Sequence, residues 1–112
     1  MSEDPLVELL WWRGCPSVER AAELVRTEMD RLGIDSSSLR VREIRDQEQS
    51  DREGFAGSPT IRVARRDIVD PAEAPRGLTC RVYRLRDGRI SALPDRADVA
   101  AALAAALKGA DA

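Results

Sequence analysis

The sequence predicts one small α/β domain in which strands and helices alternate along the chain. Residues 5–12 form an apolar run, and a segment with helical periodicity follows at residues 18–32. Later segments repeat this alternation, so the expected order is strand, helix, strand, short helix, strand, strand, helix. A chain of 112 residues is long enough for one modest core, and we expect a single domain over residues 1–112.

The first strand is expected at residues 5–12 and should be central in the sheet. Both of its faces are apolar, as in a strand that is covered on each side. Glu8 is the exception. We expect its carboxylate on the less covered face; the alternative is a buried proton acceptor near a reactive thiol.

The first helix is expected at residues 18–32, with Pro16 at its first position and Gly33 at its end. Its apolar stripe is Val18, Ala22, Val25, Met29 and Leu32. Cys15 then lies at the start of this helix, where unpaired N–H groups and the helix dipole stabilise a thiolate. Cys15 is therefore a candidate reactive thiol; the alternative is a buried cysteine that packs as a small hydrophobic residue.

The middle of the chain predicts a second strand and a short helix. Residues 39–44 alternate apolar and charged side chains, with Leu39 and Val41 on the apolar face, which indicates an edge strand. Residues 46–53 are polar and predict a short surface helix closed by Gly54. Phe55 should anchor this segment to the core.

The remaining segments predict two strands and a final helix. A strand should begin at Pro59, because proline cannot donate to a strand ladder and is confined to a strand's start or an edge. The expected elements after it are a turn at 65–67, a loop at 70–77, a strand at 78–85, a turn at 86–89, and a helix from Pro94 to Gly109 with Val99, Leu103, Ala106 and Leu107 in its core stripe.

Composition excludes several classes of function. The chain has no histidine and only two cysteines, which removes Cys-His and Ser-His-Asp catalysis and leaves no metal site to expect. The net charge is −2 and no basic stripe is visible, so we expect no nucleic-acid partner. No apolar run reaches the ~20 residues that span a bilayer, and residues 1–5 do not resemble a signal peptide. We therefore expect a cytoplasmic protein without a membrane partner and without a cofactor.

Two motifs resemble the thioredoxin fold in its minimal, glutaredoxin-like form. Residues 14–21 begin with Gly-Cys-Pro, like the glutaredoxin active-site turn, and Ser58-Pro59-Thr60 is similar to the cis-proline loop of that family. The resemblance implies a four-stranded mixed sheet with flanking helices and a cis Pro59 beside Cys15. It also implies substrate contacts from Ser58, Pro59 and Thr60, to which we add Trp12 and Arg13 as neighbours of the turn.

A closer resemblance is to a small bacterial family of thioredoxin-like proteins of about this length. The shared motifs are Gly-Cys-Pro at 14–16, Gly-Phe-x-Gly-Ser-Pro-Thr at 54–60 and Gly-Leu-x-Cys-Arg-x-Tyr at 77–83. Some members of that family carry selenocysteine at the motif cysteine, and some are labelled alkylmercury lyase-like. The resemblance covers nearly the whole chain but implies no single reaction.

One departure from the glutaredoxin pattern defines the expected chemistry. Val18 stands where a dithiol enzyme has its resolving cysteine, so Cys15 should act as a monothiol. An external thiol, for which glutathione is the candidate, would then complete the reaction. Cys80 is the candidate second thiol. In a strand antiparallel to the Pro59 strand it would lie more than ~10 Å from Cys15, beyond the reach of a disulfide, so we expect it to be a buried packing residue.

Three functions remain open, and whether the protein is an enzyme stays open with them. The leading hypothesis is a redox protein in which Cys15 attacks a disulfide, a peroxide or another soft electrophile, with a small thiol or a protein disulfide as partner. The second is handling of organomercury or a soft metal through Cys15 and Cys80. The third is a non-catalytic interaction module, in which Trp11 or Trp12 would face a partner.

Overall fold

The computed structural model describes residues 6–71 and 76–110. Three expectations lie wholly or partly outside these residues. They are the character of residues 1–5, the beginning of the first strand at Pro5, and the middle of the loop at 70–77.

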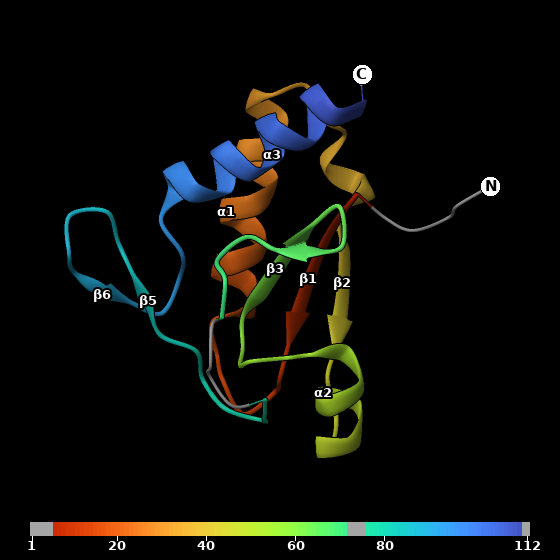
Figure 1. Ribbon diagram of the computed structural model, residues 1–112, viewed down its shortest axis with the longest axis vertical. Coiled ribbons are helices and arrows are strands. Elements are labelled where there is room, and N and C mark those ends of the chain that lie inside the picture. Colours follow the sequence, from red (N-terminus) through yellow and green to blue (C-terminus); the bar gives the residue numbers. More distant parts are fainter. Residues whose placement is uncertain (1–5, 72–75, 111–112) are drawn as a thin grey trace.

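A four-stranded mixed sheet forms the centre of the molecule (Figure 1). The strands are β1 (Val7–Trp11), β2 (Arg40–Glu43), β3 (Thr60–Val63) and β4 (Arg66–Asp67), in the order β2-β1-β3-β4. β1 runs parallel to β2 and antiparallel to β3, and β4 is antiparallel to β3. With its three helices, this arrangement confirms the predicted α/β class and is that of a minimal thioredoxin-like fold.

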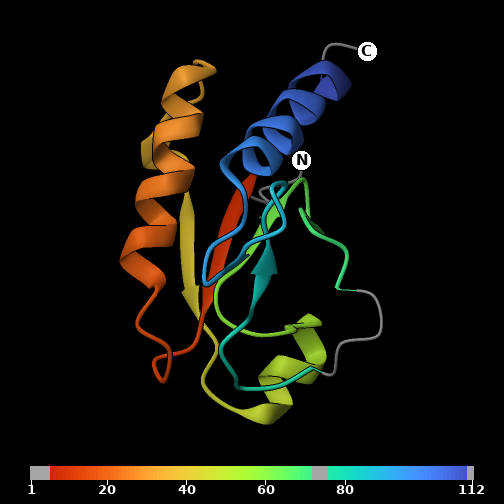
Figure 2. The same cartoon turned by 90° about the vertical axis from the view of Figure 1, so that its left-hand side faces the viewer.

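The two long helices pack against apolar residues of one face of this sheet, and Leu10 on the other face packs with Ile44 and Phe55 beside the short helix. Figure 2 shows the short helix at the lower end of the molecule. The long helices are α1 (Val18–Arg31) and α3 (Arg96–Ala110), and the short one is α2 (Gln47–Glu53). A 3₁₀ turn, η1 (Ser36–Ser38), leads into β2. The main core lies between the sheet, α1 and α3 and includes Leu9, Val25, Met29, Ile61 and Leu103.

The predicted helices are present, with small differences at their ends. α1 begins at Val18 rather than at Pro16, because Ser17 is its N-cap. α2 begins after Asp46, whose carboxylate accepts a hydrogen bond from the N–H of Gln49. It ends at Gly54, whose φ of 69° lies in the left-handed region. α3 continues through Gly109 to Ala110 instead of ending at the glycine.

Phe55 is fully buried, as predicted, and packs with Leu10 and Ile44 in a second, smaller cluster near α2. At the sheet edge, β2 confirms the predicted edge strand. Val41 was expected on the apolar face of this strand but is 39% exposed. The buried apolar side chains of the segment are Leu39 and Ile44, which lie at its two ends.

The prediction for the fourth strand was wrong. Ala64 and Arg65 adopt positive φ angles and reverse the chain at once, so Arg66–Asp67 pairs with β3 where a turn was expected. Residues 78–85 therefore do not join the main sheet. Only β5 (Tyr83–Arg84) is a strand there, and it forms a separate hairpin with β6 (Ile90–Ser91) around the predicted turn at 86–89.

Within the described residues, we find no helix that combines the length and the apolar character needed to cross a membrane.

Candidate functional site

Cys15 is buried in the turn between β1 and α1. The N–H of Cys15 donates to the carbonyl oxygen of Trp12 at 3.0 Å. The Trp12 ring lies so close to Gly14 that a Cβ at that position would be 2.2 Å from it. Cys15 is only 4% exposed, and it lies two residues before the N-cap Ser17 rather than in the first turn of α1. Its Sγ lies 3.8 Å from the hydroxyl of Ser17.

The predicted cis peptide bond is present between Ser58 and Pro59, and this loop meets the Cys15 turn. The Sγ of Cys15 lies 3.6 Å from the carbonyl oxygen of Ser58. The N–H of Trp12 donates to the hydroxyl of Ser58 at 3.0 Å. The hydroxyl of Thr60 donates to the carbonyl of Gly57 at 2.7 Å. Both side-chain hydroxyls are thus engaged within the protein, and they fix the loop.

The structure also brings Cys80 to this loop, which overturns the predicted separation from Cys15. The N–H of Ser58 donates to the carbonyl of Thr79, and the N–H of Arg81 donates to the carbonyl of Ser58, each at 2.8 Å. Ser58 and Cys80 therefore pair as in a parallel ladder. Cys80 is exposed rather than buried. The prediction failed because it placed residues 78–85 antiparallel to β3, whereas residues 77–81 run beside the loop that precedes β3.

The two cysteines interact with each other. A hydrogen bond with the Cys15 side chain raises the pKa of the Cys80 thiol, and burial and the negative charge of an ionised Cys15 raise it further. The two thiols are therefore close enough to interact, although they come from segments that are far apart in the sequence.

Gly57 allows the cis-proline loop and the segment around Cys80 to lie close together. Its φ is 123°, and a Cβ on it would lie 3.0 Å from the Cβ of Arg81 and 3.2 Å from the Arg81 backbone. A side chain at this position would push the Cys80 segment away from the cis-proline loop. This glycine, next to a predicted loop, was the one sequence signal for the close approach.

Sequence reasoning missed the roles of Arg81 and Tyr83. The Arg81 guanidinium is buried and lies 2.7 Å from Asp67, 3.2 Å from the hydroxyl of Thr60 and 2.8 Å from the carbonyl of Val69. It also lies over the Tyr83 ring, 4.7 Å from the centroid. The Tyr83 hydroxyl donates to the carbonyl oxygen of Pro59. These contacts bind the Cys80 segment to the loop and to β4.

Two candidate substrate-binding residues line a hollow beside the turn. Arg13 is exposed and Trp12 is half-buried. Together with Glu43, Ile44 and Arg45 they line a cavity of about 360 Å³. Among the five predicted binding residues, Trp12 and Arg13 thus line this cavity, whereas Ser58, Pro59 and Thr60 are buried and do not line it.

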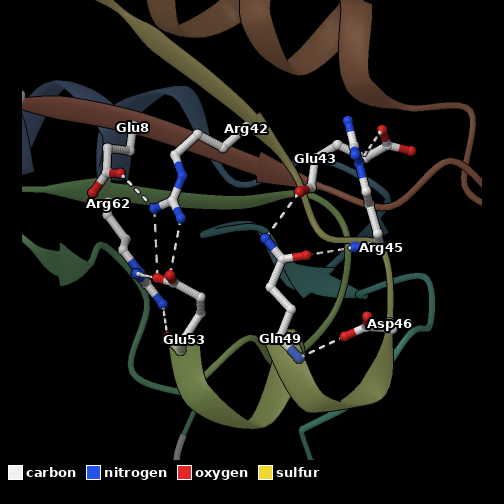
Figure 3. Close-up of polar contacts among 8 residues, drawn as sticks. All are labelled: Glu8, Arg42, Glu43, Arg45, Asp46, Gln49, Glu53 and Arg62. Carbon is white, nitrogen blue, oxygen red and sulfur yellow. Dashed lines mark hydrogen bonds and ion pairs between the residues drawn. The ribbon is translucent and has the colours of Figure 1, made fainter.

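Glu8 belongs to a separate charged network on the second face of the sheet (Figure 3). It lies on the less covered face, as expected, but it is buried there, and its carboxylate lies 3.2 Å from the guanidinium of Arg42. Arg42 also pairs with Glu53 at 2.9 Å, and Arg62 pairs with Glu53 at 3.2 Å. This network compensates the buried charge of Glu8. Glu8 thus pairs with an arginine and is not a proton acceptor for the Cys15 thiol.

No group of three or more acidic or cysteine side chains placed to hold a metal ion occurs among the residues that the structure describes. Comparisons of the chain with protein-family models, with curated proteins and with solved structures gave no match.

Proposed function

We propose that the protein is a thiol-redox protein that reacts through Cys15 with a disulfide, a peroxide or another soft electrophile. The observation that supports this most directly is the position of the Cys15 Sγ, 3.6 Å from the carbonyl of Ser58 at a cis-proline loop. The second thiol beside it, Cys80, strengthens the case. The small number of cysteines is typical of a reducing compartment, and we place the protein in the cytoplasm.

Burial favours small oxidants over large ones at Cys15. A residue that is 4% exposed admits a hydroperoxide more readily than a folded protein carrying a disulfide. In the proposed reaction the Cys15 thiolate attacks the outer peroxide oxygen. The O–O bond breaks, and the attacked oxygen stays on Cys15 as a sulfenic acid. The other oxygen leaves as hydroxide or alkoxide and takes a proton to become water or an alcohol. An external thiol such as glutathione returns it to the thiol through a mixed disulfide.

The test isolates Cys15 by replacing Cys80 with serine. After treatment of the Cys80→Ser protein with hydrogen peroxide, a sulfenic-acid trap such as dimedone should label the peptide that contains Cys15. We expect labelling at least about ten times faster than for N-acetylcysteine under the same conditions. A rate equal to that of the free thiol, in a protein shown by circular dichroism to be folded, would refute the proposal.

Adjacent thiols also support the second candidate function, binding of a soft metal ion such as Hg²⁺. Thiolates are the ligands that soft ions prefer, and two of them complete a linear site. The interaction between Cys15 and Cys80 is the observation that favours this function. Titration with Hg²⁺ should give one tightly bound ion per chain, and the Cys15→Ser and Cys80→Ser proteins should each bind it much more weakly. Equal binding by wild type and either variant would rule this function out.

A further inference from the structure

We propose that Cys80 is the resolving thiol of Cys15, so that oxidation closes a reversible disulfide between the two. This inference rests on the proposed redox function of Cys15. It replaces the expected monothiol cycle, in which only an external thiol completes the reaction, with a dithiol cycle whose second cysteine is distant in sequence and adjacent in space.

The backbone of Ser58 holds both cysteines in place. Its carbonyl oxygen receives the N–H of Arg81 at 2.8 Å and lies 3.6 Å from the Sγ of Cys15. Its N–H binds the carbonyl of Thr79 at 2.8 Å, which puts Cys80 opposite Ser58 in the ladder. Cys15 and the Cys80 segment are thus both anchored to one buried residue, and the two cysteine side chains interact.

The position of Cys15 at the cis-proline loop assigns it the first step, in which a small oxidant converts it to the sulfenic acid. The raised pKa of the Cys80 thiol makes Cys80 a poorer nucleophile toward the oxidant than an unperturbed thiol. The Cys80 sulfur then attacks the Cys15 sulfur, an S–S bond forms, and the hydroxyl leaves as water with the proton of the Cys80 thiol. One hydroperoxide has been reduced, and two thiols have been oxidised to one disulfide.

Reduction runs from the other side of the bond. Cys80 is the exposed sulfur of the pair, so a small external thiol attacks there. The S–S bond breaks, Cys15 leaves as a thiolate, and the external thiol remains on Cys80 as a mixed disulfide. A second external thiol displaces it, which releases the oxidised small molecule and restores the Cys80 thiol.

The experiment is intact-protein and peptide mass spectrometry after stoichiometric hydrogen peroxide, with dimedone present. Wild type should lose two hydrogen atoms, yield one peptide pair joined through Cys15 and Cys80, and show little dimedone adduct. The Cys80→Ser protein should instead accumulate the adduct on Cys15. Glutathione should return oxidised wild type to its starting mass.

A matched control moves the exposed thiol by two residues. Val82 is 64% exposed, and a residue two places along an extended chain lies ~6.6 Å away from Cys80. The double variant Cys80→Ser, Val82→Cys has the same number of thiols and should accumulate the dimedone adduct, with cross-linking at least about ten times slower than in wild type. Cross-linking at the wild-type rate would show that any nearby cysteine suffices.

The outcomes separate this inference from the proposed function. Dimedone adducts on Cys15 in both wild type and the Cys80→Ser protein, without a cross-link, would overturn the role of Cys80 and leave the redox role of Cys15 intact. No oxidation of Cys15 in either protein would overturn both. A cross-link between two copies through Cys80, seen as a covalent dimer, would also overturn the intramolecular disulfide.

Discussion

The N–H of Trp12 donates a hydrogen bond of 3.0 Å to the hydroxyl of Ser58. This contact joins the turn before α1 to the loop before β3, two segments that are far apart in sequence. Ser58 is fully buried and Trp12 is half-buried, so loss of this bond would leave a largely enclosed N–H without its partner. The same residue contacts Cys15 and pairs with Cys80 through its backbone. The geometry of both thiols therefore depends on how firmly this loop is held.

We predict that Ser58→Ala destabilises the protein, because it leaves the N–H of Trp12 without its partner. The expected loss in the free energy of unfolding is about 1–3 kcal/mol, measured by urea denaturation followed by circular dichroism. Thr79→Ala is the control, since the backbone carbonyl of Thr79 makes the contact with Ser58 and is retained. Its effect should stay within about 0.5 kcal/mol. Equal effects of the two changes would contradict the prediction.

Replacement of Arg81 should weaken the attachment of the Cys80 segment. Arg81→Met leaves the carboxylate of Asp67 unpaired in a site where both side chains are largely buried. We expect a loss of about 3 kcal/mol in the free energy of unfolding. Arg81→Lys keeps the charge but not the forked geometry, and should lose less.

The same Arg81 variants test whether Arg81 positions Cys80 for the cross-link, separately from its effect on stability. Under conditions where both remain folded, Arg81→Met should form the Cys15–Cys80 cross-link more slowly than wild type. The rate of sulfenic-acid formation on Cys15 should be unchanged when measured in the Cys80→Ser background. A slower cross-link together with equally slowed sulfenic-acid formation would indicate a general structural defect.

Tyr83 provides a spectroscopic test, because it is the only tyrosine in the chain. Burial raises the pKa of its hydroxyl above the usual value of 10.0. The folded protein then holds a proton that the unfolded chain loses above pH 10, so stability should fall as the pH rises through that range. Tyrosinate absorbance should appear only as the protein unfolds. A normal titration near pH 10 in the folded state would disprove the burial of this hydroxyl.

Glu53 should contribute to stability at neutral pH but not in acid. Hydrogen bonding to Arg42 lowers the pKa of its carboxyl below 4.5, with further lowering from Arg62. This contribution is complete above pH 4.5 and is lost as the pH falls through the folded-state pKa. Glu53→Gln should therefore be less stable than wild type at neutral pH, and the difference should shrink in acid. Urea midpoints over this pH range measure it.

The control for this series is Glu48→Gln, which removes a carboxylate from the exposed 3.9 Å pair with Arg52. We expect a change within about 0.5 kcal/mol across the range, as for other exposed pairs. If both variants shift the urea midpoint equally at neutral pH, the network around Arg42 does not stabilise the fold.

Local patterns were sufficient to predict the central strand and the long helices, whereas the cis peptide bond at Pro59 was predicted from the resemblance to the glutaredoxin-like family. The apolar stripe of α1 and the position of Pro59 depend on residues that are close in sequence, and tertiary packing did not override them. The meeting of Cys15 with this loop followed from the resemblance to thioredoxin-like proteins and is present in the structure.

The position of Cys80 depends on a longer path that no local pattern encodes. An early reversal at Ala64 and Arg65 gives the fourth strand to residues 66–67, and the following segment then returns beside Ser58. Sequence periodicity predicted a strand over residues 78–85, but only Tyr83–Arg84 forms one, and the periodicity carried no information about which segment lies beside Cys80. The face of Glu8 followed from the alternation along β1, but its burial did not, since its partner Arg42 comes from another strand.

The return of the chain between β4 and α3 carries Cys80 to the site without adding a strand to the central sheet. The second thiol therefore arrives together with the contacts that hold it, because Arg81 and Tyr83 belong to the same excursion and bind Asp67 and the carbonyl of Pro59. A chain shortened across this excursion would lose these contacts as well as Cys80. The single substitution Cys80→Ser is thus the single-thiol counterpart that keeps the framework, and comparing it with wild type measures what the second thiol adds to the chemistry.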